Sequence, residues 1–367
     1  MARPIRETPI LTGTDAKRFV SEMKKVEKLS KETRSDNRKS LMNEFEKLIE
    51  TAESICILGH TNPDGDCLGS TLGTKLYIQE RYPDKKVNVY LQTANEKFRF
   101  MPGFDDIIHV PSDRKYQLCI ICDCNGYDRV GDFKILAEHA ENVYVVDHHI
   151  PGNQKFEKCT IIPEASSTCE VVYDLMDDSF VNKDAASCLY LGLVHDTGVF
   201  KYNCTSKHTM EIAGQLISKG IDFGSIIDDT YYTKTYAQQQ VLGRVLTESL
   251  MIMDKRCIAG WLTCKDMRFY NVTSKDIDGI VSTMRETRGV DCAVFIYEMT
   301  NQNYKVSLRS NNNMLDVAKV ASHFGGGGHK MAAGCTLQGS HFDVINNVTK
   351  ELAKQLDAPG FVSNSAQ

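Results

Sequence analysis

The 367-residue sequence predicts an α/β protein, in which an N-terminal domain with a mainly parallel sheet flanked by helices precedes a smaller α/β domain. Three observations support this fold class. Short apolar runs alternate with segments of helical periodicity from residue 41 onward, which is typical of a parallel sheet covered by helices. Polar residues directly follow several of these runs. The length, with 42% hydrophobic and 25% charged residues, suits a globular protein of two domains.

The first half of the chain alternates strands and helices. Short runs rich in Ile, Val, Leu or Cys predict buried strands at 54–58, 87–91, 118–122 and 143–146. Apolar residues at helical spacing predict helices at 41–52, 68–82, 128–140, 168–176, 183–194 and 207–219. This alternation favours a parallel sheet with helices on both faces.

The second half opens with a long helical pattern at 236–250, which we interpret as a linker helix. Predicted strands follow at 257–264, 291–299 and 304–310, and predicted helices at 275–287, 314–324 and 343–356. We therefore divide the chain into an arm at 1–40, a first domain at 41–232, a linker at 233–250, a second domain at 251–358 and a loose tail at 359–367.

Charge is distributed unevenly along the chain. Residues 1–40 hold 11 Lys and Arg against 6 Asp and Glu, which leaves −10 for the rest of a chain whose net charge is −5. The arm contains a predicted amphipathic helix at 15–30. It either packs on the first domain, the favoured interpretation, or contacts a protein partner or nucleic acid. The negative total charge argues against nonspecific electrostatic binding of nucleic acid by the whole protein.

No targeting or membrane segment is expected. The first residues lack the apolar core of a signal peptide, and no apolar run approaches the ~18 residues of a membrane span. We therefore expect a cytoplasmic protein. Cys119 and Cys122 form a C-x-x-C pattern, but it lies on a predicted strand, where Cys119 points away from Cys122 and Cys124. Buried reduced thiols are favoured over a zinc site.

A polar loop after the first predicted strand is the first candidate site. It holds His60, Asp64 and Asp66, and Pro63 and Gly65 break regular structure between them. Ligands of open α/β sheets bind at the carboxyl ends of the strands. Buried carboxylates held close together need a cation or a paired group. The loop therefore indicates a divalent-metal site, although a plain turn with Asp66 as helix N-cap would explain it if it stood alone.

Acidic and imidazole side chains also end other predicted strands and helices: Asp123 after 118–122, Asp147, His148 and His149 after 143–146, and Asp196 after 183–194. Because the strand ends of a parallel sheet share one edge, we expect these groups to converge on the first loop.

Four carboxylates and two histidines can bind two divalent ions, with one carboxylate bridging. Oxygen and nitrogen donors without thiolate favour Mn²⁺, with Mg²⁺, Co²⁺ and Zn²⁺ as alternatives. A pair of such ions activates water and stabilises the leaving oxygen at a phosphoryl centre.

Five motifs in this order resemble the DHH/DHHA1 family of phosphoesterases. They are H-x-x-P-D-G-D-x-x-G-S at 60–70, the Asp after the strand 118–122, D-H-H at 147–149, D-T-G-x-F at 196–200 and G-G-G-G-H at 325–329. The resemblance covers residues 41–358, and within the family the chain looks like the stand-alone NrnA-type enzymes. It implies a catalytic DHH domain at 41–232 and a substrate-binding DHHA1 domain at 251–358.

The resemblance also implies a role for each residue that matches the family motifs. His60 and Asp64 would hold one metal ion, and Asp66, His148 and Asp196 the other, with Asp123 bridging them. Asp147 would orient a histidine, and His149 would face the scissile phosphate as an electrostatic stabiliser or proton donor. The nucleophile implied is a metal-activated water and not a side chain.

The second domain is expected to bind the nucleotide. Consecutive glycines expose backbone N–H groups that can surround an anion, and a guanidinium can contact a phosphate through two parallel hydrogen bonds. By resemblance, the terminal phosphate and sugar would contact Arg309, Ser310, Gly326, Gly327, Gly328 and His329.

The function implied is two-metal-dependent hydrolysis of short oligoribonucleotides such as pApA and pGpG from the 5′ end, with removal of the 3′-phosphate of 3′-phosphoadenosine 5′-phosphate (PAP). A phosphodiesterase acting on cyclic dinucleotides such as c-di-AMP is the alternative within this chemistry. From another class, the protein could be a binding module that recruits RNA or a partner through its basic arm. Whether it forms a homodimer is left open.

Overall fold

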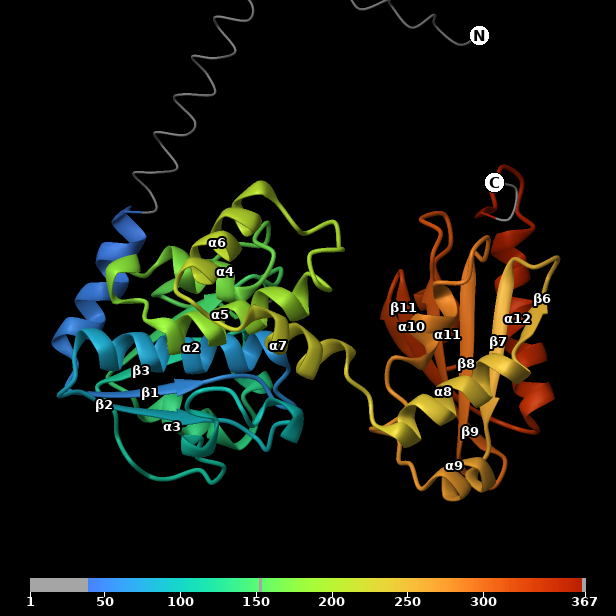
Figure 1. Ribbon diagram of the computed structural model, residues 1–367, viewed down its shortest axis with the longest axis horizontal. Helices are drawn as coiled ribbons and strands as arrows, with labels where there is room; N and C mark the ends of the chain where they lie inside the picture. Colours follow the sequence, from blue (N-terminus) through green and yellow to red (C-terminus); the bar gives the residue numbers. More distant parts are fainter. Residues whose placement is uncertain (1–38, 152–153, 365–367) are drawn as a thin grey trace, which may run out of the picture. The chain divides into compact units, whose positions relative to one another are not determined.

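The computed structural model of the protein describes residues 39–151 and 154–364. The chain divides into two compact units, with the boundary between Thr233 and Lys234 (Figure 1). Each unit has its own sheet and hydrophobic core. Among the described residues, no helix is long and apolar enough to cross a membrane. The predicted arm helix at 15–30 lies outside the described residues.

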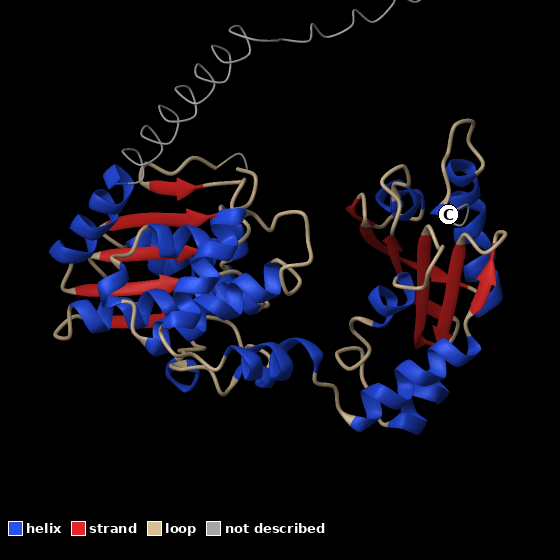
Figure 2. Ribbon diagram, turned by 45° about the horizontal axis from the view of Figure 1, so that its top comes forward, coloured by secondary structure: helices blue, strands red, loops and turns tan. Residues whose placement is uncertain are grey.

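A five-stranded parallel sheet forms the centre of the first unit, in the order β2-β1-β3-β4-β5. Its strands are β1 Ser54–Leu58, β2 Lys86–Tyr90, β3 Leu118–Cys122, β4 Asn142–Asp147 and β5 Cys159–Ile161. All five point the same way, so their carboxyl ends share one edge (Figure 2). The predicted parallel sheet is confirmed. Strand β5, which has only three residues, was not predicted.

Different helices cover the two faces of this sheet. Ile55 and Ile57 of β1 pack toward α2 and α5, whereas Cys56 and Leu58 belong to the core on the α3 side (Figure 1). Residues 39–51 are also helical. The α-helices of this unit are α2 Gly65–Arg81, α3 Lys134–His139, α4 Thr168–Asp174, α5 Lys183–Asp196, α6 Lys207–Ser218 and α7 Phe223–Ile227. Shorter helical turns lie at Glu96–Phe98, Phe104–Asp106, Tyr127–Arg129, Gly131–Phe133, Asp178–Phe180 and Asp228–Tyr232.

Helices α2 and α5 approach each other closely because glycines face the contact. A Cβ atom added at Gly69 would lie 2.4 Å from the carbonyl oxygen of Cys188, and one at Gly73 would lie 2.9 Å from the side chain of Leu189. This contact brings the first turn of α2 beside the last turn of α5. Two of the predicted metal ligands therefore reach the same end of the sheet.

A six-stranded mixed sheet forms the second unit, in the order β10-β11-β9-β8-β7-β6. Only β7 and β8 run parallel to each other. The strands are β6 Leu250–Ile252, β7 Cys257–Leu262, β8 Cys292–Thr300, β9 Asn303–Ser310, β10 Gly327–His329 and β11 Ala332–Gln338. The helices are α8 Tyr236–Glu248, α9 Cys264–Tyr270, α10 Ile280–Arg285, α11 Val317–His323 and α12 His341–Leu356.

Two cores lie on opposite faces of this second sheet. One contains residues of α11 and α12, and the other contains residues of α8 and α10. Val241 and Val245 of α8 are fully buried, and Val245 packs against Gly260 of β7. The helix that we interpreted as a linker is therefore an integral part of the second unit.

Several predicted helices are shorter in the structure, and the cause is local backbone geometry. The helix predicted at 128–140 breaks at Gly131, which has φ +61°, and continues as α3. The one predicted at 275–287 begins only after Gly279, where φ is +87°. Conversely, α2 begins three residues earlier than predicted because Asp64, and not Asp66, is its N-cap.

Candidate metal centre

The loop after β1 presents His60 and Asp64 at the carboxyl edge of the sheet. The Nδ1–H group of His60 donates to the carbonyl oxygen of Thr61 at 2.8 Å. This leaves Nε2 directed at two carboxylates, 3.2 Å from Asp123 Oδ2 and 3.7 Å from Asp64 Oδ1. A second hydrogen bond that fixes one ring nitrogen and frees the other is usual for metal-binding histidines.

Asp66 is fully buried in the first turn of α2, and the first turn of α4 donates hydrogen bonds to it. Its two carboxylate oxygens accept hydrogen bonds from the backbone amides of Thr168, at 2.6 Å, and Cys169, at 2.9 Å. These amides have no partner within α4 because they belong to its first turn. The carboxylate is thereby held in one orientation at the edge of the sheet.

Asp123 lies at the centre of the cluster, directly after β3. Its backbone has φ +58°, in the left-handed region that Asp tolerates better than most residues. Its Oδ1 accepts a hydrogen bond from the Thr168 hydroxyl at 2.9 Å, and Oδ2 faces His60. Because Oδ1 also lies 3.8 Å from His148 Nε2 and 3.4 Å from His149 Nδ1, this carboxylate adjoins every histidine of the site.

Asp147 ends β4 and anchors the two histidines that follow it. Its Oδ1 accepts hydrogen bonds from the backbone amides of His148 and His149, at 2.7 and 3.1 Å. The same oxygen accepts one from His149 Nδ1 at 2.8 Å. Asp147 therefore anchors the ring of His149. The side chain of His149 is 41% exposed, and its Nε2 is free of this contact.

Asp196, at the end of α5, completes the cluster. Its Oδ2 lies 3.0 Å from Nε2 of His148, and that same Nε2 lies 3.9 Å from Asp66 Oδ2. Polar side chains from the ends of β1, β3 and β4 and from α2 and α5 thus converge, as we expected from the parallel topology. Ligand atoms of Asp66, His148 and Asp196 all lie within 4.8 Å of one another. The same holds for two groups that contain Asp123: Asp123, Asp147, His148 and His149, and His60, Cys67 and Asp123.

The electrostatics of the cluster favour bound positive charge. Burial, with the nearby charge of Asp123, raises the pKa of Asp66 to about 7. Burial, with the charge of Asp66, raises the pKa of Asp196 to about 6. Burial alone would lower the pKa of His148, but the adjacent carboxylates Asp196 and Asp66 outweigh it and raise the pKa to about 10. Without a cation the cluster retains protons, which a bound metal would displace.

Unsatisfied buried atoms provide a separate test of whether a metal fits. Among the described residues, Oδ2 of Asp147 and Nε2 of His148 are buried and have no aligned hydrogen-bond partner, although the latter lies close to Asp196. Buried polar atoms rarely remain unpaired. Unpaired oxygen and nitrogen atoms that can act as metal ligands, beside clustered carboxylates and imidazoles, fit divalent cations well.

Three contributors were missed in the sequence analysis. Thr168 and Cys169 hold Asp123 and Asp66, and the signal for them was the S-x-x-E pattern at 167–170 that marks a helix N-terminus. Gly192 lies against Asp66, where an added Cβ would come 2.6 Å from Oδ1. No local pattern marks this glycine.

Two nearby residues do not behave as ligands. Cys67 lies beside His60 and Asp123, but burial raises the pKa of its thiol to about 12, so the thiolate needed for metal binding is disfavoured. His195, which the sequence analysis left out of the site, forms a hydrogen bond with Thr230 at 2.9 Å and packs against Phe98. Its ring also lies against Gly65, where an added Cβ would come 2.3 Å from Cγ of the imidazole.

In the second unit, Arg309 and His329 lie on the same face of the sheet. Arg309 of β9 pairs with Ala332 of β11, and Ala332 pairs with His329 of β10. Directly paired residues project to one side, so the guanidinium and the imidazole flank a small alanine. His329 is exposed, and Arg309 is half-buried with Nη1 donating to the Leu308 carbonyl oxygen at 3.0 Å.

Ser310 and Gly326 are placed differently from our expectation. Ser310 is fully buried, and its hydroxyl donates to the carbonyl oxygen of Asn312 at 2.8 Å. The Gly326 amide donates to the carbonyl oxygen of Ala321 at 2.9 Å, so it is not available to an anion. Gly327 and Gly328 form β10 and pair with β11. The glycine run is therefore an edge strand and not an open anion nest.

Comparison with known proteins places the chain in a family. Residues 54–193 match the DHH family, N-terminal domain, and residues 258–356 match the DHHA1 domain. The "Probable bifunctional oligoribonuclease and PAP phosphatase NrnA" of Streptococcus mutans is 29% identical over 294 residues, which cover 78% of this chain and 90% of that protein. The bifunctional oligoribonuclease and PAP phosphatase NrnA of Bacillus subtilis is 23% identical over 304 residues, covering 81% and 93%.

A solved structure agrees with this result. The crystal structure of an exopolyphosphatase-related protein from Bacteroides fragilis has a TM-score of 0.78 and 28% identity, and the match covers 86% of this chain and 96% of that one. The two family matches together span more than half of the sequence and occur in the order that the motifs predicted. The chain therefore belongs to the DHH family of phosphoesterases and carries a DHH domain followed by a DHHA1 domain.

Proposed function

We propose that this protein is a metal-dependent phosphoesterase that hydrolyses very short oligoribonucleotides, such as pApA and pGpG, to mononucleotides and removes the 3′-phosphate of PAP. The observation that carries this proposal is the meeting of Asp66, Asp123, His148 and Asp196 at the carboxyl edge of the sheet, where Nε2 of His148 lies within 4 Å of all three carboxylates. The NrnA relatives, which span most of the chain and are named for these two activities, support the choice of substrates.

We propose the metal ligands that the family resemblance implied, and the clustering of most of them at the edge of the sheet supports this choice. His60, Asp64 and Asp123 would hold one divalent cation, and Asp66, His148 and Asp196 the other, with Asp123 shared. Mn²⁺ suits this oxygen and nitrogen donor set, and Mg²⁺, Co²⁺ or Zn²⁺ could replace it. Two divalent cations bound there would supply the charge that activates a water molecule and stabilises the leaving oxygen.

His149 is the residue that we place against the scissile phosphate. The hydrogen bond from its Nδ1 to Asp147 raises the pKa of the imidazole, and this favours the protonated ring. Its Nε2–H can then stabilise negative charge or protonate the leaving oxygen. In the second unit, Arg309 and His329 would bind a phosphate of the nucleotide.

The test is a comparison of substrates with the full-length protein and Mn²⁺. We expect release of AMP from pApA and of phosphate from PAP, and little turnover of a long unstructured RNA. Equal rates on pApA and the long RNA would contradict the proposal. Faster turnover of c-di-AMP than of pApA would favour the cyclic-dinucleotide alternative. Asp132→Asn, an exposed residue outside the cluster, provides a matched control for ligand variants.

A further inference from the structure

A buried carboxylate outside the metal cluster has no part in the proposed ligand set. Glu170 of α4 is only 5% exposed. Its Oε2 accepts two hydrogen bonds from Ser166, one from the backbone amide at 3.3 Å and one from the hydroxyl at 2.5 Å. A third comes from the hydroxyl of Thr209 at 2.6 Å. Because all three donors are neutral groups, the burial of this carboxylate is costly.

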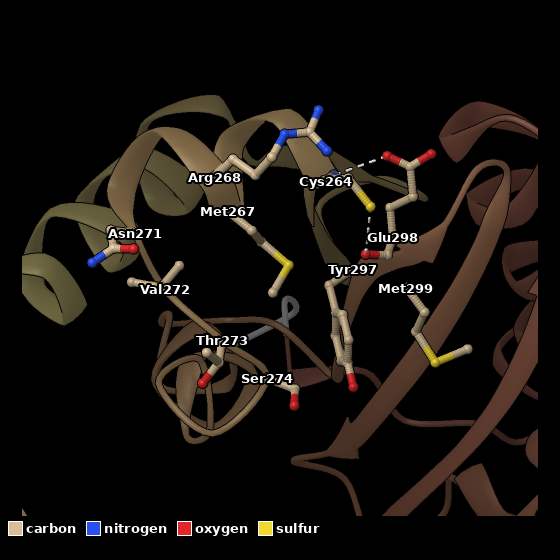
Figure 3. Close-up of a pocket in the computed structure, with 10 residues that line it drawn as sticks. All are labelled: Cys264, Met267, Arg268, Asn271, Val272, Thr273, Ser274, Tyr297, Glu298 and Met299. Carbon is tan, nitrogen blue, oxygen red and sulfur yellow. Dashed lines mark hydrogen bonds between the residues drawn. The ribbon is translucent and has the colours of Figure 1, made fainter.

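A second carboxylate with neutral donors shows the contrast. Glu298 lines an open pocket of about 520 Å³ in the second unit (Figure 3). It accepts hydrogen bonds from the backbone amides of Cys264, at 2.8 Å, and Gln302, at 3.1 Å. Glu298 is only half-buried, so water can still solvate its charge. The cost of burial therefore singles out Glu170 and not every acid that accepts hydrogen bonds from neutral groups.

The capping of α4 does not account for this carboxylate. Ser167 is the N-cap, and its side chain accepts a hydrogen bond from the backbone amide of Glu170 at 3.1 Å. In a complete capping box the glutamate would bind the backbone N–H of the N-cap residue in return. Here the carboxylate binds Ser166, one residue earlier, and also reaches beyond the helix to Thr209. Its hydrogen bonds thus connect two segments of the chain.

One of these segments is the turn that holds two of the proposed metal ligands. The backbone amides of Thr168 and Cys169 donate to the two carboxylate oxygens of Asp66. The Thr168 hydroxyl donates to Asp123. Glu170 fastens this turn from both sides, through its own place in α4 and through the residue that precedes the N-cap. The direction of these donors therefore depends on Glu170.

The other segment is the start of α6, which follows a third proposed ligand. The hydroxyl oxygen of Thr209 accepts from the amide of Ser206, the N-cap of α6, at 3.1 Å, while its proton goes to Glu170. The loop that begins after Asp196 ends at Ser206. Within this loop, Sγ of Cys204 lies 3.7 Å from the carbonyl oxygen of Asp196. Glu170 thus also fixes the far end of the loop that contacts Asp196.

We propose that Glu170 is a positioning residue for the metal centre, whose carboxylate ties the first turn of α4 to that of α6 and so keeps the proposed ligands in place for a cation. The inference rests on the proposed function, because it gives Glu170 a role in metal binding. Glu170 acts through Thr168 and Thr209. Residues that orient metal ligands in this way typically change metal affinity 10- to 100-fold when they are replaced.

The test measures Mn²⁺ binding to the full-length protein by isothermal titration calorimetry. Glu170→Ala should weaken Mn²⁺ binding by about 10-fold. Glu170→Gln keeps an acceptor oxygen, although a neutral one that accepts weaker hydrogen bonds, and should recover most of this loss. Thr209→Val and Thr209→Ser form a second pair, in which only valine lacks the hydroxyl. This pair answers the question even if Glu170→Ala does not fold.

An activity measurement divides the effect between metal and substrate. The Mn²⁺ concentration that gives half-maximal PAP hydrolysis should rise by the same factor in Glu170→Ala as the dissociation constant for Mn²⁺. At saturating Mn²⁺, the KM for PAP should equal that of the parent protein, because Glu170 does not contact the substrate.

Two controls separate positioning from stability. Leu216→Ala removes a buried apolar group of α6, so it should lower resistance to denaturant and leave Mn²⁺ affinity unchanged. Glu298→Ala removes the comparison carboxylate and should also leave Mn²⁺ affinity unchanged. Parent-like Mn²⁺ affinity in folded Glu170→Ala or Thr209→Val would overturn the inference while the proposed function stands. An equal loss in Leu216→Ala would overturn it too, since affinity would then follow stability. A parent protein that binds no Mn²⁺ would refute the proposed function and this inference with it.

Discussion

The two sheets of this protein assemble their polar groups in different ways. In the first unit, parallel strands deliver His60, Asp123 and His148 to one edge, where the imidazoles lie close to clustered carboxylates. In the second unit, β10, β11 and β9 run antiparallel, and the groups of interest stand on one exposed face, set by the two-residue alternation of each strand. One arrangement concentrates charge, and the other distributes it along a surface.

This difference indicates that a strand edge suits ion binding and a sheet face suits substrate binding. A strand edge lets loops and helix ends add further ligands from several directions, so it can surround an ion. A sheet face offers rows of side chains at fixed spacing and no enclosure, which suits the binding of an extended chain. We therefore expect changes at the edge to abolish catalysis, and changes on the face to alter substrate affinity.

The largest effect is expected from Asp123→Asn. This carboxylate lies within 4 Å of His60, His148, His149 and Thr168, and in the proposed function its charge would be shared by two cations. Turnover of every substrate should fall by at least about 10³-fold, and bound Mn²⁺ should decrease. Steady-state kinetics and metal analysis measure these effects, with Asp132→Asn as control. Retained activity would remove Asp123 from the centre of the mechanism.

Arg309→Gln should affect binding more than chemistry. Loss of one charge-assisted contact corresponds to ~1.5–3 kcal/mol, or about 10- to 100-fold in KM for pApA. Hydrolysis of bis(p-nitrophenyl) phosphate, which offers no nucleotide to the second unit, should hardly change. Arg288→Gln, a change at an exposed arginine of this unit, is the control. A comparable loss of kcat on both substrates would contradict the division of roles between edge and face.

Gly192→Ala tests how tightly the edge is packed. Its new Cβ would fall 2.2 Å from Cys169 Sγ and 2.6 Å from Asp66 Oδ1, so the carboxylate must shift. We expect a stability loss of ~1–3 kcal/mol and weaker Mn²⁺ binding. Gly214→Ala, in an exposed turn of α6 with no atom near the new Cβ, should instead stabilise by ~0.5–1 kcal/mol. Denaturant unfolding distinguishes the pair, and equal effects would show that the edge tolerates added volume.

The smallest expected effect is a pH dependence of the metal-free protein. The folded-state pKa values of Asp66, about 7, and Asp196, about 6, lie above the ordinary 3.8. Raised carboxyl pKa values contribute stability that is present below the ordinary value and lost as pH rises through the folded one. Stability should therefore fall between about pH 4 and pH 7, and the raised pKa of His148, about 10, adds a loss of the same sign at higher pH.

Thermal unfolding with EDTA or Mn²⁺ across this range measures that dependence. The melting temperature in EDTA should drop by a few degrees, because ~1 kcal/mol shifts it by about 2–4 °C in a domain of this size. The gain from Mn²⁺ should grow with pH, since the metal displaces protons. A melting temperature in EDTA that rises over this interval would refute the assigned pKa directions.

Much of the edge could be predicted from sequence because its signals are local. Asp123 and Asp147 each come at the end of a short apolar strand. The rule that parallel strands end at one edge of the sheet is enough to predict that they lie close together. The DHH and DHHA1 motifs lie in a fixed order, and this predicted both domains. Thr168 could have been inferred from the helix-start pattern around it, since an uncapped first turn offers its amides to nearby acids.

Other features were decided only by tertiary contacts. The buried state of Ser310, the pairing of Gly327–His329 as an edge strand and the burial of α8 depend on neighbours distant in sequence. Asn364, in the predicted loose tail, donates its amide N–H to the buried carboxylate of Asp291 at 2.8 Å. The sequence by itself determined which groups end each strand. Only the tertiary packing decided which glycines and which helix ends lie against these groups. The reason is that two elements can approach closely only where the surfaces of both allow it.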